Sequence, residues 1–224
     1  MKHRSSFEEA YSLILEEIVN GELKPGEAIT EVFLAKKYGI SRTPVREALN
    51  RFQCEGLINT SNRAKRIFSL NPHDVEEIFE LKKLIEGNVA EKAAGNLTEE
   101  AAAELKIIVT GMNELSEYST KDEKDEMKLL ENWLKLDRQF HEILFRIYGN
   151  RRSQQLIEKL NLQWHRLKIG LVAIEGRIGL AILEHQRIGN AILEKDPERA
   201  RSTMVEHLDN LKKVLQKLMN AFKY

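Results

Sequence analysis

The sequence predicts a mostly α-helical protein of two domains, and three observations support this fold class. Apolar residues recur at helical spacing along almost the whole chain of 224 residues. Short β-like segments occur in only one region, near residue 60. The dipeptide Asn71-Pro72 divides the chain, because asparagine caps helices and proline fits their first turn. The predicted domains are therefore residues 1–71 and 72–224.

The composition, with 42% hydrophobic and 31% charged residues, is typical of a globular protein. The formal net charge is zero, yet residues 36–66 hold eight Lys or Arg against two acids. This local positive charge favours a nucleic-acid partner. The zero net charge of the whole chain argues against a protein that packs DNA non-specifically, because such a protein needs a broadly basic chain. No apolar run approaches the roughly 20 residues of a membrane span, and no apolar leader follows Met1, so we expect a cytoplasmic protein without a membrane partner.

Two helices are expected before residue 40. The first covers residues 7–20 and stops at Gly21, and its apolar stripe consists of Phe7, Tyr11, Ile14 and Ile18. Thr30 can cap the second, which stops before Gly39. Both helices present one apolar face and so predict a small shared core.

A third helix is expected to begin at Ser41 or Thr43 and to carry DNA-binding chemistry. Pro44 fits its first turn, where a backbone N–H has no intrahelical partner. One face is apolar and suits a core: Val45, Ala48, Leu49 and Phe52. The other face is polar and projects outward: Arg42, Arg46, Asn50 and Gln53. Two hydroxyls, two guanidinium groups and the positive end of the helix dipole meet there, as a reader of phosphates and base edges requires.

A β-hairpin is expected after this helix. Residues 57–60 and 67–70 are β-like runs, and the polar, basic residues 61–66 separate them. Three helices followed by a hairpin make a winged helix-turn-helix.

The first domain closely resembles the DNA-binding domain of the GntR family of bacterial transcriptional regulators. The matching segments are Gly21–Gly26, Leu34–Leu49 and Glu55–Leu57, and the resemblance covers about residues 7–70.

This resemblance implies specific roles for the DNA-binding residues. Arg42 and Arg46 would read bases, and Ser41 and Thr43 would hold phosphates. The hairpin would enter the neighbouring minor groove with its three cations, Arg63, Lys65 and Arg66. A homodimer would bind an inverted repeat in double-stranded DNA.

Apolar periodicity predicts a bundle of about six helices and no strand after Asn71. Their approximate bounds are 72–94, 98–115, 127–148, 151–174, 177–194 and 197–222. The stripe of the first of these helices is Ile78, Leu81, Ile85, Val89 and Ala93.

Four polar residues interrupt the apolar stripes of this bundle. Asp137 and His141 lie one turn apart on one helix, and His185 and His207 lie on two others. Burial of an unpaired imidazole or carboxylate costs about 1–3 kcal/mol, so the four side chains should share a partner. A divalent metal would satisfy them, since three nitrogens and one carboxylate suit Zn²⁺, Ni²⁺ or Mn²⁺. The alternative is that each is a hydrogen-bonded core residue.

The second domain resembles the FCD effector-binding domain of the FadR subgroup of GntR regulators. The matching segments are Glu80–Glu86, Asp137–His141, Tyr148–Asn150, Glu184-His185, Asp196–Ala200 and His207. The resemblance implies an Asp/His/His/His metal site at the floor of a pocket for a small carboxylate effector, and dimer formation. Three cations could pair with this effector, although surface charge is the alternative for the two arginines: Lys82, Arg166 and Arg177.

Two functions fit these features. The first is a DNA-binding transcriptional regulator, expected to be a repressor, whose operator binding responds to a small organic acid at the metal site. The alternative is a metal-dependent hydrolase that uses the same four side chains to activate water. The hydrolase leaves the basic segment from Ser41 to Arg66 without a role, so we do not expect an enzyme.

Overall fold

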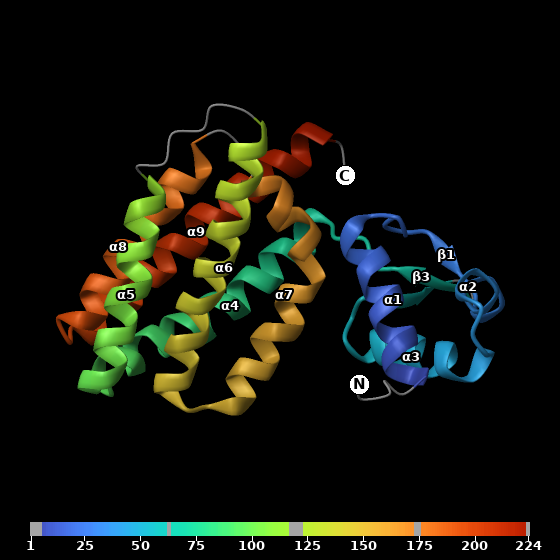
Figure 1. Cartoon of the computed structure of the whole chain (residues 1–224), viewed down its shortest axis with the longest axis horizontal. Coiled ribbons are helices and arrows are strands. Elements are labelled where there is room, and N and C mark those ends of the chain that lie inside the picture. Colours follow the sequence, from blue (N-terminus) through green and yellow to red (C-terminus); the bar gives the residue numbers. More distant parts are fainter. Residues whose placement is uncertain (1–5, 62–63, 117–122, 173–175, 223–224) are drawn as a thin grey trace. The chain divides into compact units, whose positions relative to one another are not determined.

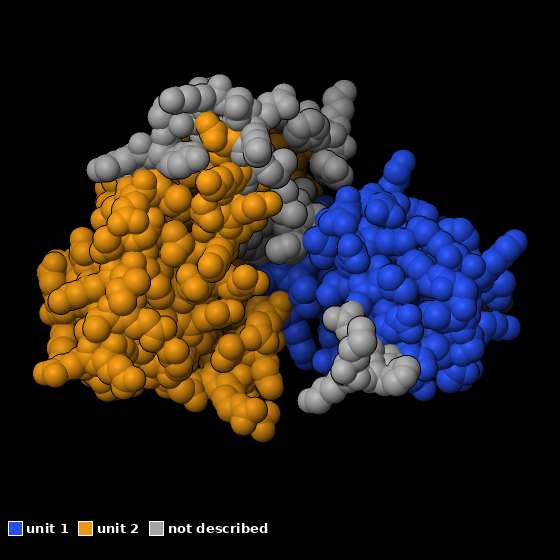
Figure 2. All heavy atoms as spheres, in the orientation of Figure 1, with its two compact units in different colours: residues 1–71, 159–166 blue, residues 72–158, 167–224 orange. Residues whose placement is uncertain are grey.

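A computed structural model describes residues 6–61, 64–116, 123–172 and 176–222. The chain divides into two compact units (Figure 2). The first contains residues 1–71 and 159–166, and the second contains residues 72–158 and 167–224. No described helix combines the length and the apolar composition that a membrane crossing requires.

The first unit contains a helix-turn-helix and a small antiparallel sheet (Figure 1). Its helices are α1 (Ser6–Asn20), α2 (Glu31–Tyr38) and α3 (Arg42–Cys54). The sheet has the strand order β1-β3-β2, with β1 at Ala28–Ile29, β2 at Ile58–Ser61 and β3 at Ala64–Ile67. The predicted winged helix-turn-helix is confirmed.

The hairpin differs from its predicted position. The second strand runs over Ala64–Ile67 rather than over residues 67–70, and it pairs Ile67 with Ile58 and Lys65 with Thr60. Lys65 and Arg66 therefore lie in a strand and not in a loop. The strand begins earlier than predicted because polar residues can alternate with apolar ones in a strand. Lys65 and Ile67 point to one face of the sheet, while Arg66 points to the other. Strand β1 was not predicted, since two residues carry no periodicity.

Local sequence signals position α2 and α3. Thr30 Oγ1 accepts a hydrogen bond of 3.2 Å from the backbone N–H of Phe33, which caps α2. Gly39 ends this helix with a left-handed backbone (φ 68°), a conformation that glycine adopts without strain. The turn is short, so α3 begins at Arg42 with Ser41 as its N-cap residue.

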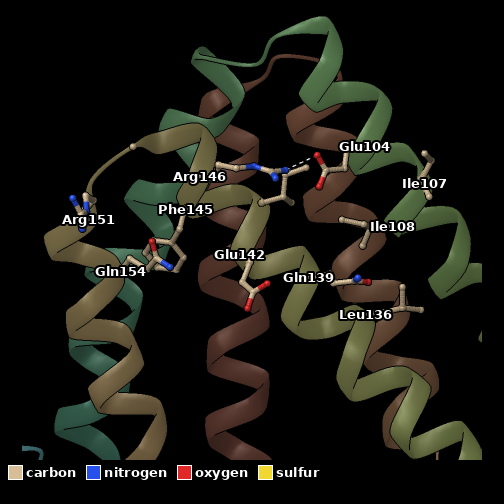
Figure 3. Close-up of a pocket in the computed structure, with 12 residues that line it drawn as sticks. Glu104, Ile107, Ile108, Leu136, Gln139, Glu142, Phe145, Arg146, Arg151 and Gln154 are labelled. Atoms are coloured by element: carbon tan, nitrogen blue, oxygen red, sulfur yellow. Dashed lines mark hydrogen bonds and ion pairs between the residues drawn. The ribbon is translucent and has the colours of Figure 1, made fainter. Parts of the chain in front are cut away.

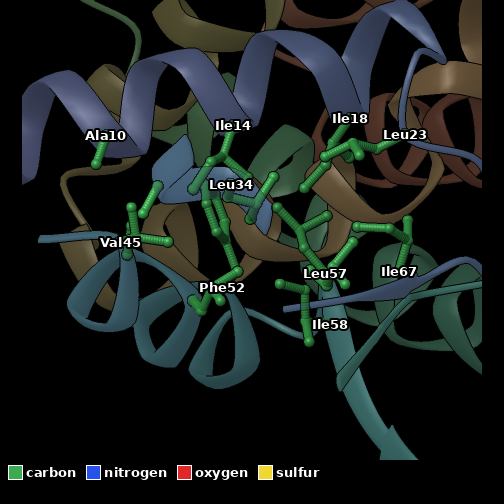
Figure 4. Close-up of a cluster of buried hydrophobic side chains, with 14 residues drawn as sticks. Ala10, Ile14, Ile18, Leu23, Leu34, Val45, Phe52, Leu57, Ile58 and Ile67 are labelled. Atoms are coloured by element: carbon green, nitrogen blue, oxygen red, sulfur yellow. The ribbon is translucent and has the colours of Figure 1, made fainter. Parts of the chain in front are cut away.

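The core of the first unit holds the inner faces of α1, α3 and the sheet together (Figure 4). The predicted apolar face of α3 is confirmed, since Val45, Ala48, Leu49 and Phe52 are all fully buried. The ring of Tyr11 on α1 stacks on Phe52 with centroids 4.5 Å apart. Burial of this face fixes which side of α3 remains exposed.

The second unit is built from helices, as the sequence predicts. They are α4 (Pro72–Gly95), α5 (Glu99–Ser116), α6 (Glu123–Tyr148), α7 (Arg151–Val172), α8 (Arg177–Leu193) and α9 (Pro197–Phe222). Residues 159–166 of α7 group with the first unit. Helix α4 packs along α9 and also contacts α6 and α8, so these four helices surround one interior.

The buried face of α4 includes Ile78, Val89 and Ala93 of the predicted stripe but differs from it in the middle of the helix. Leu81 is 43% exposed, whereas Lys82 and Glu86 are 3% and 2% exposed. The two charged residues form an ion pair one turn apart, which allows both to be buried. A polar interior therefore faces α4 at this level of the bundle.

Candidate nucleic-acid interface and metal centre

The predicted DNA-reading residues lie together at the first turns of α3. Arg42, Thr43 and Arg46 are exposed, and so is Ser41, whose side chain makes no capping hydrogen bond. The guanidinium of Arg42 lies 3.5 Å from the carboxylate of Glu31, a long contact that a phosphate can replace. This end of α3 thus offers hydroxyls, guanidinium groups and free backbone N–H groups to an anionic partner.

Two cations of the wing make hydrogen bonds to other parts of the first unit. Arg66 donates a hydrogen bond of 2.9 Å to the carbonyl oxygen of Gly26. The ammonium of Lys65 donates a hydrogen bond of 2.7 Å to Oδ1 of Asn50 on α3. Arg63 lies outside the described residues. Lys65 therefore connects the wing directly to the recognition helix.

Three of the predicted metal ligands form a cluster in the second unit. His141 on α6, His185 on α8 and His207 on α9 offer nitrogens that all lie within 4.8 Å of one another. His185 and His207 are 0% and 4% exposed, and His141 is partly exposed. An ion bound at about 2.1 Å from each nitrogen would require them to be somewhat closer together than this limit of 4.8 Å.

Asp137 lies beside this histidine cluster. Its Oδ1 is 3.4 Å from Nε2 of His185 and 3.9 Å from Nε2 of His141, and the residue is 6% exposed. The structure thus brings all four sequence-predicted ligands together, from three helices.

Each histidine of the cluster has its Nδ1 engaged by an oxygen. The pairs are His141 with Glu86 Oε2 at 3.1 Å, His185 with the carbonyl oxygen of Ala181 at 2.8 Å, and His207 with Glu184 Oε2 at 2.7 Å. Nε2 is then the nitrogen left for an ion, the arrangement that second-shell oxygens impose on metal-binding histidines. Nε2 of His185 is buried and has no hydrogen bond from any described residue.

The protonation states suit metal binding. Burial lowers the pKa of His207 to about 4 and outweighs the hydrogen bond to Glu184, which acts to raise it. The ring is therefore neutral at pH 7, the form that coordinates. Burial acts to raise the pKa of Glu184 and of Glu86, but the hydrogen bond with His207 lowers the first and the charge of Lys82 lowers the second, so both stay ionised.

Two of the predicted effector cations are buried beside these carboxylates. Nζ of Lys82 lies 2.6 Å from Glu86 Oε1, and Nη2 of Arg177 lies 3.0 Å from Glu184 Oε2. Arg177 is only 5% exposed, so the alternative that it is a surface charge is wrong. The side chain of Arg166 lies outside the described residues.

Glu86 and Glu184 were not predicted as site residues, although the sequence carries a signal for each. Glu86 follows Lys82 by one helical turn, and an opposite-charge pair at that spacing can be buried. Glu184 directly precedes His185 in the sequence, so it lies at the same level of α8 but contacts a different residue, His207. An analysis of apolar periodicity misses both residues, because it assigns charged side chains to the exposed face of a helix.

A groove of about 740 Å³ lies among α5, α6 and the start of α7 (Figure 3). Residues of α5, α6 and the start of α7 line it, including Gln139, Glu142 and the ion pair between Arg146 and Glu104. Neither Asp137 nor His141 is among its lining residues. The groove is therefore separate from the candidate metal centre.

Comparisons with known proteins agree with both halves of this description. Residues 7–64 match the family of bacterial regulatory proteins of the gntR type, and residues 77–210 match the FCD domain. The uncharacterized HTH-type transcriptional regulator YdhC of Bacillus subtilis is 30% identical over 211 residues, which span 92% of this chain and 91% of that protein. The HTH-type transcriptional regulator LutR of the same species is 30% identical, over 88% of this chain and 95% of its own length.

The fold has a solved counterpart as well. The E. coli protein McbR/YncC superposes with a TM-score of 0.71 at 21% identity, over 96% of this chain and 99% of that one. The similar sequences are named as regulators, which implies a regulator rather than an enzyme. The chain thus belongs to the GntR family of bacterial transcriptional regulators, in the FadR subgroup that carries an FCD domain.

Proposed function

We propose that this protein is a repressor whose operator affinity is controlled by a small carboxylate bound at a divalent metal. Residues 1–71 would bind DNA, and residues 72–224 would bind the effector and form the dimer. The observation that carries the proposal is the convergence of three histidines whose Nδ1 atoms are already engaged. The protein would act in the cytoplasm, where its operator is.

The side chains present fit a metal ion. His141, His185, His207 and Asp137 would hold it with three nitrogens and one oxygen, which suits Zn²⁺, Ni²⁺ or Mn²⁺. The buried Nε2 of His185 supports this interpretation, because an imidazole nitrogen without a hydrogen bond is costly in a buried site. When bound, the ion supplies open coordination positions for a carboxylate, and Arg166 and Arg177 are candidate partners for its charge.

The carboxylates behind the histidines should position the ligands. Glu184→Gln keeps the size of the side chain but removes the charge that holds Nδ1 of His207. We expect about 10- to 100-fold weaker metal binding, the usual effect of losing such a partner. Calorimetric titration of Zn²⁺ into the chelator-treated protein measures this. Glu206→Gln, at an exposed glutamate of α9, should bind as the wild type does; equal losses in both variants would contradict the positioning role.

The operator is expected to be an inverted repeat bound by a homodimer. One recognition helix reads only a few base pairs, so a second copy is needed for a site of useful length. A dimer seated on a promoter would exclude polymerase, and this would give repression. Light scattering at micromolar concentration should give a dimer mass, with and without DNA, and a monomer under both conditions would contradict the proposal.

Two measurements on the purified full chain test the proposed function as a whole. Elemental analysis should find one divalent metal per chain, and selection from a random double-stranded DNA pool should recover a palindromic site. A preparation that contains no divalent metal and selects no palindromic site would refute the proposal.

A further inference from the structure

The contact between Lys65 and Asn50 joins the wing to the recognition helix at a point where DNA would be read. Asn50 is exposed and lies one turn beyond Arg46, on the same stripe of α3 as Arg42. The three side chains therefore follow one another along the face of α3 that would enter the major groove of DNA. Lys65 adds an ammonium to the end of this stripe.

Lys65 lies in the central strand of the sheet, which is paired on both sides. Strand β3 is central, and Lys65 is paired with Ile29 on one side and with Thr60 on the other. Residues directly opposite in a sheet share a face, so Lys65 lies on the same face as the buried Ile29. Its aliphatic part can cover the edge of the core while its ammonium reaches α3.

The hydrogen bond decides which way the amide of Asn50 points. An ammonium has only donors, so the amide must turn its oxygen to Lys65, and it does so at 2.7 Å. The amide nitrogen of Asn50 is then left as a donor. Asparagine usually reads adenine with both atoms, because Oδ1 accepts from N6 while Nδ2 donates to N7. Here Lys65 engages the oxygen that this contact needs.

We propose that Asn50 and Lys65 form a donor-only pair that recognises a guanine in each operator half-site. Guanine presents two adjacent acceptors in the major groove, O6 and N7, whereas adenine places an N6 donor beside its N7. Two neighbouring donor groups therefore match guanine and oppose adenine. The inference rests on the DNA-binding function proposed above, and it adds a base position to those proposed for Arg42 and Arg46. It places Lys65 in the major groove beside α3, rather than in the minor groove expected for the hairpin, because Lys65 is bonded to Asn50 of that helix.

The test is selection from a random double-stranded DNA pool with the full-length wild type and three variants. The wild type should enrich a guanine that Asn50→Ala no longer selects, with discrimination at that position falling roughly tenfold. Lys65→Ala should admit adenine at the same position, because the amide oxygen is released. Asn50→Asp keeps a partner for Lys65 but presents acceptors, so it should change the preference from guanine to cytosine, whose N4 is a donor.

The controls separate the possible failures. Asn20→Ala, at an exposed asparagine of α1, should leave the base profile unchanged, and equal melting temperatures show that the variants fold. If the three variants weaken binding equally for all sequences, the pair contacts phosphates only and the inference is overturned. If the wild type itself enriches no sequence, the proposed DNA-binding function fails instead.

Discussion

Replacement of Arg46 by alanine should abolish most of the sequence preference of this protein. Arg46 is exposed one turn beyond Arg42 on α3, where a guanidinium can reach guanine O6 and N7 together. Such a bidentate contact is worth about 1–3 kcal/mol of discrimination, and a dimer makes it twice. Competition between a selected operator and scrambled DNA should therefore show the two affinities converging in Arg46→Ala.

Thr43→Ala is the matched comparison on the same helix end. Its hydroxyl is expected to hold a phosphate, so its loss should weaken binding to all sequences by a similar factor. Unchanged selectivity in Arg46→Ala would remove this arginine from base recognition. A loss of selectivity in Thr43→Ala as large as that in Arg46→Ala would contradict the division of roles between the two residues.

Removal of the metal should lower the melting temperature by several degrees. The candidate ligands come from α6, α8 and α9, so a bound ion would cross-link three helices, and its binding free energy would add to folding. An ion present at 100 times its Kd contributes about 2.7 kcal/mol. For a chain of this size that corresponds to roughly 5–10 °C. Thermal melts of the protein before and after chelator dialysis measure the shift.

His185→Ala should abolish both the metal and the shift. His185 is fully buried at the centre of the cluster, with its ring 4.6 Å from that of His207 and 5.4 Å from that of His141. His73→Ala is the control, because His73 is exposed at the start of α4 and its side chain is paired with Glu77. Stoichiometric metal in His185→Ala would mean that the four residues are a hydrogen-bonded polar core.

Periodicity and capping signals were sufficient to predict the helices of both units. Thr30, Gly39 and Pro72 mark helix ends through local backbone chemistry, which needs no knowledge of distant contacts. The four polar residues on apolar stripes could also be picked out, because a buried imidazole on a helix requires a partner. Asp137 and His141 are one turn apart in any helix, so part of their geometry follows from spacing alone.

Features that depend on long-range pairing could not be predicted in the same way. Strand β1 exists because Ala28 and Ile29 pair with Arg66 and Lys65, which are distant in the sequence. The burial of Lys82 likewise depends on Glu86 and on the histidine that Glu86 contacts, so hydropathy could not predict that Lys82 rather than Leu81 is buried. Position alone could not distinguish Arg177 at a buried helix start from a surface arginine.

The most direct test of the proposed regulation is the operator affinity of one preparation with and without metal, across a panel of small carboxylates from acetate to citrate. We expect at least one carboxylate to change the affinity of the metal-loaded protein about 5- to 150-fold, the usual range of allosteric coupling. After chelation the response should vanish, while basal DNA binding, which depends on residues 7–70, largely survives. A carboxylate response that persists without metal would contradict the proposed sensing site, and loss of all DNA binding on chelation would make the metal structural instead.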